Sequence, residues 1–129
     1  LYVTGTDMSS VSSTVTAKLQ ATADADAVIG LAAPVTLTIV KAVDAAGSNT
    51  KVASFDMNAE LGKAITDGKV AFTVDQQPWL QGYGSIDALW QVKRGGFHLG
   101  GGLPVLTGPS IIDKDSAAQV LEYAQQGIR

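Results

Sequence analysis

The 129-residue sequence contains no cysteine and a single histidine, and both scarcities narrow its chemistry. Without cysteine, the chain has no disulfide, no thiolate nucleophile and no thiolate zinc site. One histidine is too few for a zinc site built on imidazole ligands. No apolar run approaches the roughly 18 residues that a membrane-spanning helix needs. We therefore expect neither a metal site nor a bound cofactor.

Charged residues are also few, and neither sign dominates. Nine basic residues stand against twelve acidic ones, for a net charge of −3, and no basic cluster occurs. A nucleic-acid surface is not expected, because such binding depends on neutralising phosphates. Hydrophobic residues make up 46% of the chain and charged residues 16%, as in a globular protein. The length fits one domain with one core.

The chain begins with Leu1, and the next residues already have the character of a strand. A natural chain seldom starts inside an element, so we expect a processed or truncated piece of a longer protein. No signal peptide is present, although such a piece would have lost one.

Short β-branched runs alternate with segments of helical periodicity. Strands are expected at Leu1–Gly5, Ala27–Leu31, Lys51–Phe55, Val70–Val74 and Leu103–Thr107. Helical stripes of apolar side chains follow them, at Val11, Val15 and Leu19, at Val35, Ile39 and Val43, at Leu61 and Ile65, at Trp79, Tyr83, Ile86 and Trp90, and at Ala117, Val120, Leu121 and Ala124. The alternation predicts an α/β fold with a mainly parallel sheet. Several strands are apolar on both faces, which favours flanking helices on both sides.

Polar side chains follow three of the expected strands. Asp7 follows the first, Asp56 follows Lys51–Phe55, and Asp75, Gln76 and Gln77 end the fourth. Ligands of open parallel sheets bind outside the carboxyl ends of the strands, so these residues are site candidates. Asp7 and Asp56 could instead cap the helices that begin near residues 9 and 58. Three polar residues in a row exceed what one cap requires.

No catalytic set assembles around these candidates. His98 lies in the glycine-dense segment 95–102, which has no phosphate-binding motif and is interpreted as a flexible surface connection. No G-x-S-x-G elbow occurs for a nucleophilic serine. The carboxylates and amides that remain suit the hydroxyls of a neutral polyol.

The run KVASFDMNAELGKAITDGKVAFTVDQQPWLQGYGSIDALW, followed by GGGLPVLTGPSIIDKD, resembles the C-terminal lobe of type I periplasmic sugar-binding proteins of ABC transporters. The resemblance covers essentially the whole chain, and its motifs are specific in combination. It implies a Rossmann- or flavodoxin-like α/β lobe. The sugar-binding core of LacI-type transcription regulators is a more distant relation.

The resemblance implies a ligand site. Asp56 matches the family aspartate that bonds sugar hydroxyls, and Gln76 matches the family glutamine at a crossing between lobes, with Asp75 beside it. Residues 75–78 and 107–110 are the expected hinge crossings. The family often has an Asn-Asp pair where this chain has Ala32-Ala33-Pro34, so that contact is absent or made by backbone.

The resemblance also implies that residues 1–129 form a single, incomplete C-terminal lobe. The N-terminal lobe and the first strand–helix unit are missing. Helix 79–93 packs on the other lobe in such proteins, so its apolar stripe would have no partner within this chain. We expect association with the missing lobe or a symmetric dimer, since burying one such aromatic side chain stabilises by roughly 1.5–3 kcal/mol.

The function expected from the resemblance is non-enzymatic. It is binding of a simple sugar or polyol between two lobes and delivery to a membrane ABC permease, in the periplasm or another extracytoplasmic space. Two alternatives stay open: the effector-binding core of a LacI-type regulator, and a flavodoxin-like enzyme with Asp56 or Asp75 as general base.

Overall fold

A computed structural model describes residues 7–22 and 24–129 of the chain. The elements in chain order are α1 (Met8–Ala21), β1 (Ala27–Gly30), α2 (Ala33–Ala46), β2 (Lys51–Phe55), α3 (Ala59–Thr66), β3 (Phe72–Asp75), α4 (Pro78–Gly95), the 3-10 turn η1 (Leu99–Gly102), β4 (Ser110–Asp113) and α5 (Lys114–Gln125). The strand expected at Leu1–Gly5 lies outside the described residues. No helix in the described ranges is long and apolar enough to cross a membrane.

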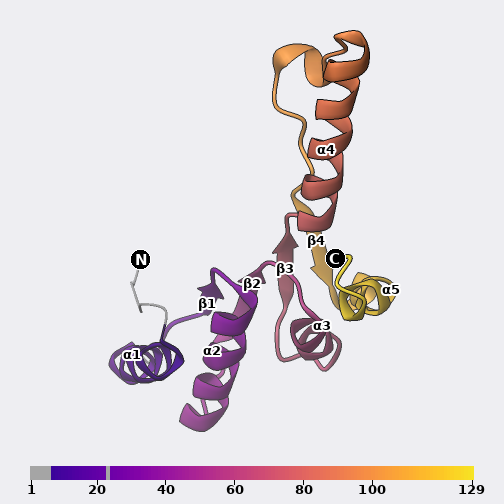
Figure 1. Ribbon diagram of the computed structural model, residues 1–129. Helices are drawn as coiled ribbons and strands as arrows, with labels where there is room; N and C mark the ends of the chain where they lie inside the picture. Colours follow the sequence, from indigo (N-terminus) through magenta and orange to yellow (C-terminus); the bar gives the residue numbers. More distant parts are fainter. Residues whose placement is uncertain (1–6, 23) are drawn as a thin grey trace.

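The four strands form one sheet in the order β1-β2-β3-β4 within the described residues. β1 and β2 are parallel, β2 and β3 are parallel, and β4 runs antiparallel to β3. α2 and α3 make the two parallel crossovers (Figure 1). The predicted α/β fold with a mainly parallel sheet is confirmed.

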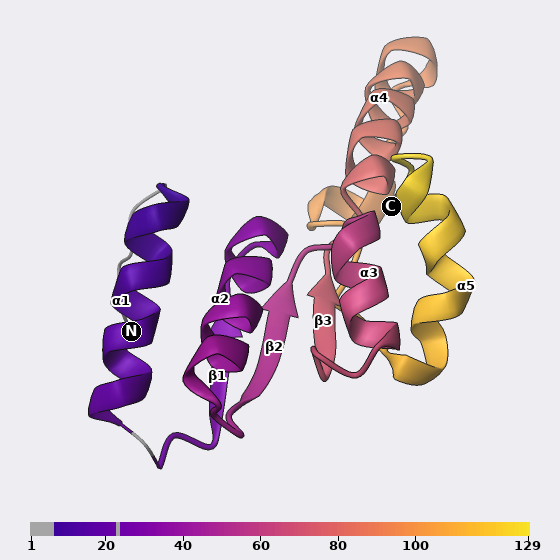
Figure 2. The same cartoon turned by 90° about the horizontal axis from the view of Figure 1, so that it is seen from below.

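Helices α1, α2, α3 and α5 lie side by side on one face of the sheet (Figures 1 and 2). The core lies between this layer and the sheet, where Val11, Leu61, Ile65 and Val70 are at most 1% exposed. Within residues 7–22 and 24–129, helices cover one face of the sheet, so the expectation of helices on both faces is wrong. On the open face, Ile29 is 55% exposed and Ile111 is 54% exposed.

The helix boundaries follow local chemistry. Pro34 lies in the first turn of α2, and Gly47, at φ 61°, ends the helix as predicted. The Asp113 side chain accepts hydrogen bonds from the backbone of Asp115 and Ser116, so β4 passes directly into α5 through a capping box.

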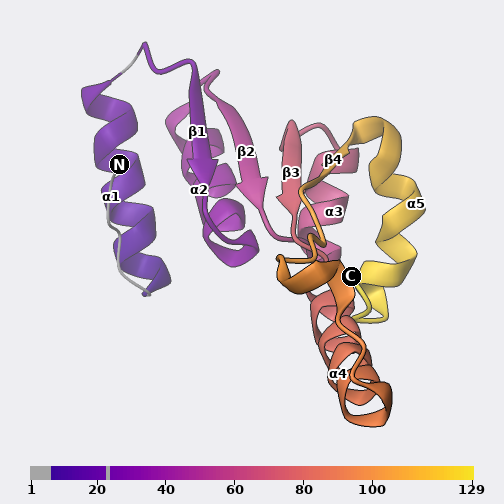
Figure 3. The same cartoon turned by 90° about the horizontal axis from the view of Figure 1, so that it is seen from above.

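α4 projects from the sheet, and residues 99–107 return along it to β4 (Figures 1 and 3). None of its 18 residues is buried. The strand expected at Leu103–Thr107 is wrong, because this apolar run lies along the projecting helix and away from the sheet. Its Leu103 and Leu106 side chains are 74% and 82% exposed. The pairing strand begins instead at Ser110, beyond Pro109, which has no N–H to donate to a ladder.

Candidate functional site

Asp56 and Gln76 meet at the carboxyl ends of β2 and β3. The Gln76 side-chain amide donates a hydrogen bond from Nε2 to Asp56 Oδ1, at 2.6 Å. The backbone N–H of Asp56 donates to the carbonyl of Val74 at 3.0 Å, which extends the β2–β3 pairing beyond the last residue of β2. The Asp56 side chain is half-buried and that of Gln76 is exposed. A carboxylate and an amide are therefore joined at this rim of the sheet and accessible from solvent.

The backbone at these strand ends is unusual. Asp56 has φ 66° and Gln77 has φ 58°, and these are the non-glycine residues with positive φ in the described part of the chain. A left-handed conformation is disfavoured for side chains with a Cβ, although aspartate tolerates it better than most. Strain of this kind concentrates at functional sites, where the surrounding structure holds it. Both strained residues border the Asp56–Gln76 contact.

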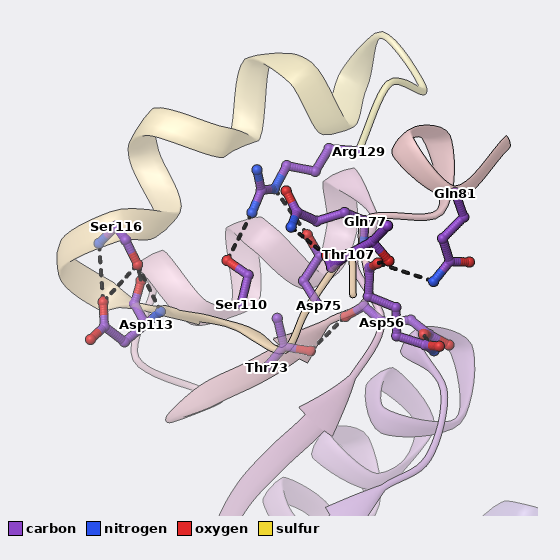
Figure 4. Close-up of polar contacts among 11 residues, drawn as sticks. Asp56, Thr73, Asp75, Gln77, Gln81, Thr107, Ser110, Asp113, Ser116 and Arg129 are labelled. Atoms are coloured by element: carbon purple, nitrogen blue, oxygen red, sulfur yellow. Dashed lines mark hydrogen bonds and ion pairs between the residues drawn. The ribbon is translucent and has the colours of Figure 1, made fainter. Parts of the chain in front are cut away.

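The segments after β3 and before β4 run side by side next to this contact. The Gln77 side-chain amide donates to the Thr107 carbonyl, and the Thr107 hydroxyl donates to the Gln76 carbonyl at 2.9 Å (Figure 4). A Cβ added to Gly108 would lie 3.0 Å from the Asp75 carbonyl oxygen, so the close approach favours glycine there. Gln81, one turn into α4, donates to the Gln76 carbonyl at 3.1 Å.

A pocket of about 470 Å³ opens where these segments meet the sheet. Its lining comprises Phe55, Val74, Gln76, Gln81 and residues 105–109. Such a pocket combines an apolar wall with a few convergent polar groups, the usual composition of a small-molecule site.

Asp75 is placed differently from its neighbours. Its side chain is fully buried. Oδ1 accepts the backbone N–H of Gln77 at 3.0 Å, and Oδ2 lies 2.9 Å from Nε of Arg129. Oδ1 is thus hydrogen-bonded within the chain, while Oδ2 faces the Arg129 charge and has no hydrogen-bond partner among the described residues. The structure brings Asp56 and Gln76 together and places the Asp75 side chain in a separate, buried contact with Arg129.

Asp7 acts as the cap that was the alternative interpretation. Its side chain accepts hydrogen bonds from the Ser9 hydroxyl and from the Ser10 backbone N–H at the start of α1. These hydrogen bonds, that from the Ser9 side chain first, lower the pKa of Asp7 to about 2. Asp56 does not cap α3, because the Asn58 side chain accepts from the Leu61 N–H at 2.7 Å.

The other predicted features carry no site. His98 is exposed before η1, and Ala32 begins α2 without a capping side chain. No group of three or more metal-binding side chains is present in residues 7–22 and 24–129.

Sequence reasoning missed Arg129 and Thr107. Thr107 was included only as the end of an expected strand and as part of an expected hinge segment. Arg129 follows Gly127 outside any motif, 54 positions from Asp75 in the numbering. No spacing or periodicity in the sequence could have paired Arg129 with Asp75.

The structure is thus an α/β lobe with accessible polar groups where two chain segments leave the sheet. The family described as periplasmic binding protein domain matches residues 2–96. The chain belongs to this family, and the resemblance to type I periplasmic sugar-binding proteins is confirmed. It is a binding-protein lobe and not an enzyme, so the flavodoxin-like enzyme alternative is not supported.

Solved structures extend this assignment. A carbohydrate transporter from Acidothermus cellulolyticus 11B, in complex with myo-inositol, is 42% identical with a TM-score of 0.93, over 100% of this chain and 45% of that one. The myo-inositol binding protein of Caulobacter is 22% identical with a TM-score of 0.74, over 90% of this chain and 40% of that one. An ABC transporter solute binding protein from Agrobacterium vitis, solved with bound D-fucose, is 21% identical with a TM-score of 0.77, over 96% of this chain and 43% of that one.

This chain therefore spans less than half the length of those structures. The two with the lower identities show the fold alone. A search of curated proteins found no match.

Proposed function

We propose that the chain is one lobe of an ABC-transporter solute-binding protein that holds a sugar or polyol between two lobes. The observation that carries the proposal is the hydrogen-bonded pair of Asp56 and Gln76, exposed at the strand ends beside the two adjacent chain segments. Membership of the periplasmic binding protein family supports the same role. The relatives described above are transport and binding proteins, and none is a transcription regulator.

Asp56 and Gln76 are the proposed ligand contacts. A carboxylate accepts hydrogen bonds from two adjacent hydroxyls, while an amide both donates and accepts. The Gln76 side-chain amide donates to the Asp56 carboxylate at 2.6 Å. A vicinal diol replaces that contact with charge-assisted hydrogen bonds to Asp56 and an amide contact from Gln76. Asp75, predicted as a ligand contact too, is proposed to support the site without touching the ligand, since its side chain is fully buried, with Oδ1 bonded to the Gln77 N–H and Oδ2 facing Arg129.

The proposed hinge crossings are residues 75–78 and 107–110. They lie side by side, joined by the Gln77–Thr107 and Thr107–Gln76 hydrogen bonds. Everything between them, α4 and the returning segment, projects away from the helical layer and belongs on the side of the second lobe (Figure 1). Closure about such paired crossings is a common way to enclose a ligand.

The second lobe is proposed to cover α4. Trp79, Tyr83, Ile86 and Trp90 are between 49% and 69% exposed, although Trp79 and Tyr83 stack with ring centroids 5.3 Å apart. An apolar face of this kind marks an interaction site. The myo-inositol-bound relative is more than twice as long as this chain, which leaves room for another lobe. A second copy of the chain is the alternative occupant for the isolated lobe.

The ligand class is proposed to be a neutral cyclic polyol or simple sugar, with myo-inositol first. The 42% identical relative was solved with myo-inositol. Delivery to an ABC permease and an extracytoplasmic location follow from the same proposal. The isolated lobe supplies one side of the site and is expected to bind weakly or not at all.

Titration calorimetry of the complete protein tests the proposal. Its ligands are myo-inositol, D-glucose, D-ribose, D-fucose and glycerol. Asp56→Ala removes the proposed contact, and Asp67→Ala, an exposed aspartate at the end of α3, is the matched control. Binding of one polyol, abolished or weakened by Asp56→Ala and kept by Asp67→Ala, is the expected result. The absence of binding to any of the five, or equal binding by both variants, would refute the proposal.

A further inference from the structure

A buried ion pair lies under the proposed ligand site. Asp75 is fully buried at the end of β3, and the Arg129 side chain, which follows α5, is 21% exposed. Oδ2 of Asp75 and Nε of Arg129 are 2.9 Å apart. Breaking such a pair from one side is strongly destabilising, while a hydrophobic replacement of both partners is often tolerated. In some proteins a pair of this kind specifies one conformation.

Arg129 reaches both chain segments that leave the sheet. Its Nη2 donates to the Ser110 hydroxyl at 3.0 Å, while Nε faces Asp75 (Figure 4). Asp75 and Ser110 are opposite partners in the β3–β4 register, the last pair before the segments diverge toward α4. One guanidinium therefore joins the last residue of β3 to the first residue of β4.

The other oxygen of Asp75 continues this connection to the site. Oδ1 accepts the backbone N–H of Gln77, whose backbone is held at φ 58° and ψ 59°. Gln76 stands between these two residues, so its backbone is fixed from both sides. Its side chain then reaches Asp56 at 2.6 Å.

We propose that Arg129 is a positioning residue for ligand binding. It holds the Asp75 carboxylate, which holds the Gln77 N–H, so that Gln76 is presented to Asp56 and to the ligand. This inference rests on the proposed function, and it assigns a role to a residue that contacts no ligand.

The geometry requires arginine. The guanidinium is planar and always charged, so it places a positive charge next to the Asp75 carboxylate while one of its N–H groups donates to the Ser110 hydroxyl. The ammonium of lysine is a compact charge on a flexible stem. Arg129→Lys therefore keeps the charge next to Asp75 but loses the fixed bridge to Ser110. The variant separates charge compensation from positioning.

The test is a double-mutant cycle in the complete protein, read by titration calorimetry with the polyol that the wild type binds. The variants are Arg129→Lys, Gln76→Ala and their combination. Lys69→Gln is the control, since it breaks the exposed ion pair between Lys69, before β3, and Asp44, near the end of α2, away from the carboxyl ends of the strands. All titrations are made at a temperature where each variant is folded by circular dichroism.

We expect Arg129→Lys to weaken binding about tenfold, within the range measured for residues coupled to a site. In the Gln76→Ala background the same change has an effect of less than about twofold, because the residue through which Arg129 acts is gone. Lys69→Gln leaves the Kd unchanged. If Arg129 affects stability alone, Arg129→Lys lowers the Tm and leaves the Kd unchanged. That result overturns the proposal. An equal loss of affinity in both backgrounds also overturns it.

Amide hydrogen exchange at Gln77 separates this inference from the proposed function. If the wild type binds no polyol, the proposed function fails, and the exchange measurement still decides whether Arg129 controls the crossing. Faster exchange of the Gln77 N–H in Arg129→Lys, with unchanged exchange in the core of β2, supports the positioning role. Unchanged exchange at Gln77 refutes it.

Discussion

The exposed face of α4 gives a prediction whose size follows from the structure. Trp90 is 57% exposed, and its ring lies 5.2 Å from the guanidinium carbon of Arg94. A tryptophan side chain buries up to roughly 250 Å² in a core or an interface, so a second lobe would cover somewhat over 100 Å² here. At roughly 25 cal/mol per Å², this burial stabilises the complete protein by about 3 kcal/mol.

The change that tests this estimate is Trp90→Lys in the complete protein. We expect the free energy of unfolding, measured by urea denaturation, to fall by about 3 kcal/mol, since a lysine ammonium cannot enter an apolar interface without losing its hydration. Lys93→Gln is the matched control, because Lys93 is already exposed on the same helix. Its effect is expected to stay within about 0.5 kcal/mol.

A fall of less than about 1 kcal/mol for Trp90→Lys would refute the reasoning, because it would show that the face is uncovered in the complete protein. The isolated lobe allows a second test of whether the exposed face of α4 binds a partner. Light scattering on it is expected to show association that Trp90→Lys abolishes. A stable wild-type monomer with solvent-exposed tryptophan fluorescence would contradict that expectation.

Three further predictions concern the site and the start of α1. Asp56→Ala is expected to weaken polyol binding by about 1.5–3 kcal/mol, as for a lost charge-assisted hydrogen bond, and unchanged affinity in calorimetry would remove Asp56 from the site. Gly108→Ala places a Cβ 3.0 Å from the Asp75 carbonyl oxygen. We expect thermal denaturation to show a loss of about 1–3 kcal/mol, and a neutral result would show that the two crossings can separate. Asp7 has its pKa lowered from 3.8 to about 2, so its stabilising effect is present above pH about 4 and is lost as the pH falls through about 2. The Tm difference between wild type and Asp7→Asn should therefore shrink over that range, and a constant difference from pH 5 to 2 would contradict this.

Much of the fold could be predicted from residue patterns. β2 spans the expected Lys51–Phe55, and the stripes around Val11, Val35 and Ala117 all lie on observed helices. These elements were predictable because their apolar side chains face a core built from this chain. The capping alternative for Asp7 was also available, since a serine-rich start follows it directly.

The expectation at Leu103–Thr107 failed for a physical reason. That run has the apolar character of a strand, yet it runs along α4, joins no sheet and leaves Leu103, Val105 and Leu106 exposed. An apolar pattern indicates that a segment is buried against something. It does not say whether the burying surface belongs to the same chain. β4 was missed because it has only four residues and its last residue, Asp113, is also the cap of α5.

The site was only partly predictable. Asp56 and Gln76 could be named because both follow strands at one edge of a parallel sheet. The buried state of Asp75 could not, because it depends on Arg129, which joins β3 and β4 across a long sequence separation. A carboxylate at a strand end is equally suited to a ligand and to a buried partner. Only the fold decides between them.

A crystal structure of the complete protein with its bound polyol tests the central claim most directly. The account predicts that ligand hydroxyls lie within about 3.2 Å of a carboxylate oxygen of Asp56 and of the side-chain amide of Gln76. It also predicts that α4 packs against the second lobe. A ligand that contacts neither Asp56 nor Gln76 would contradict the account.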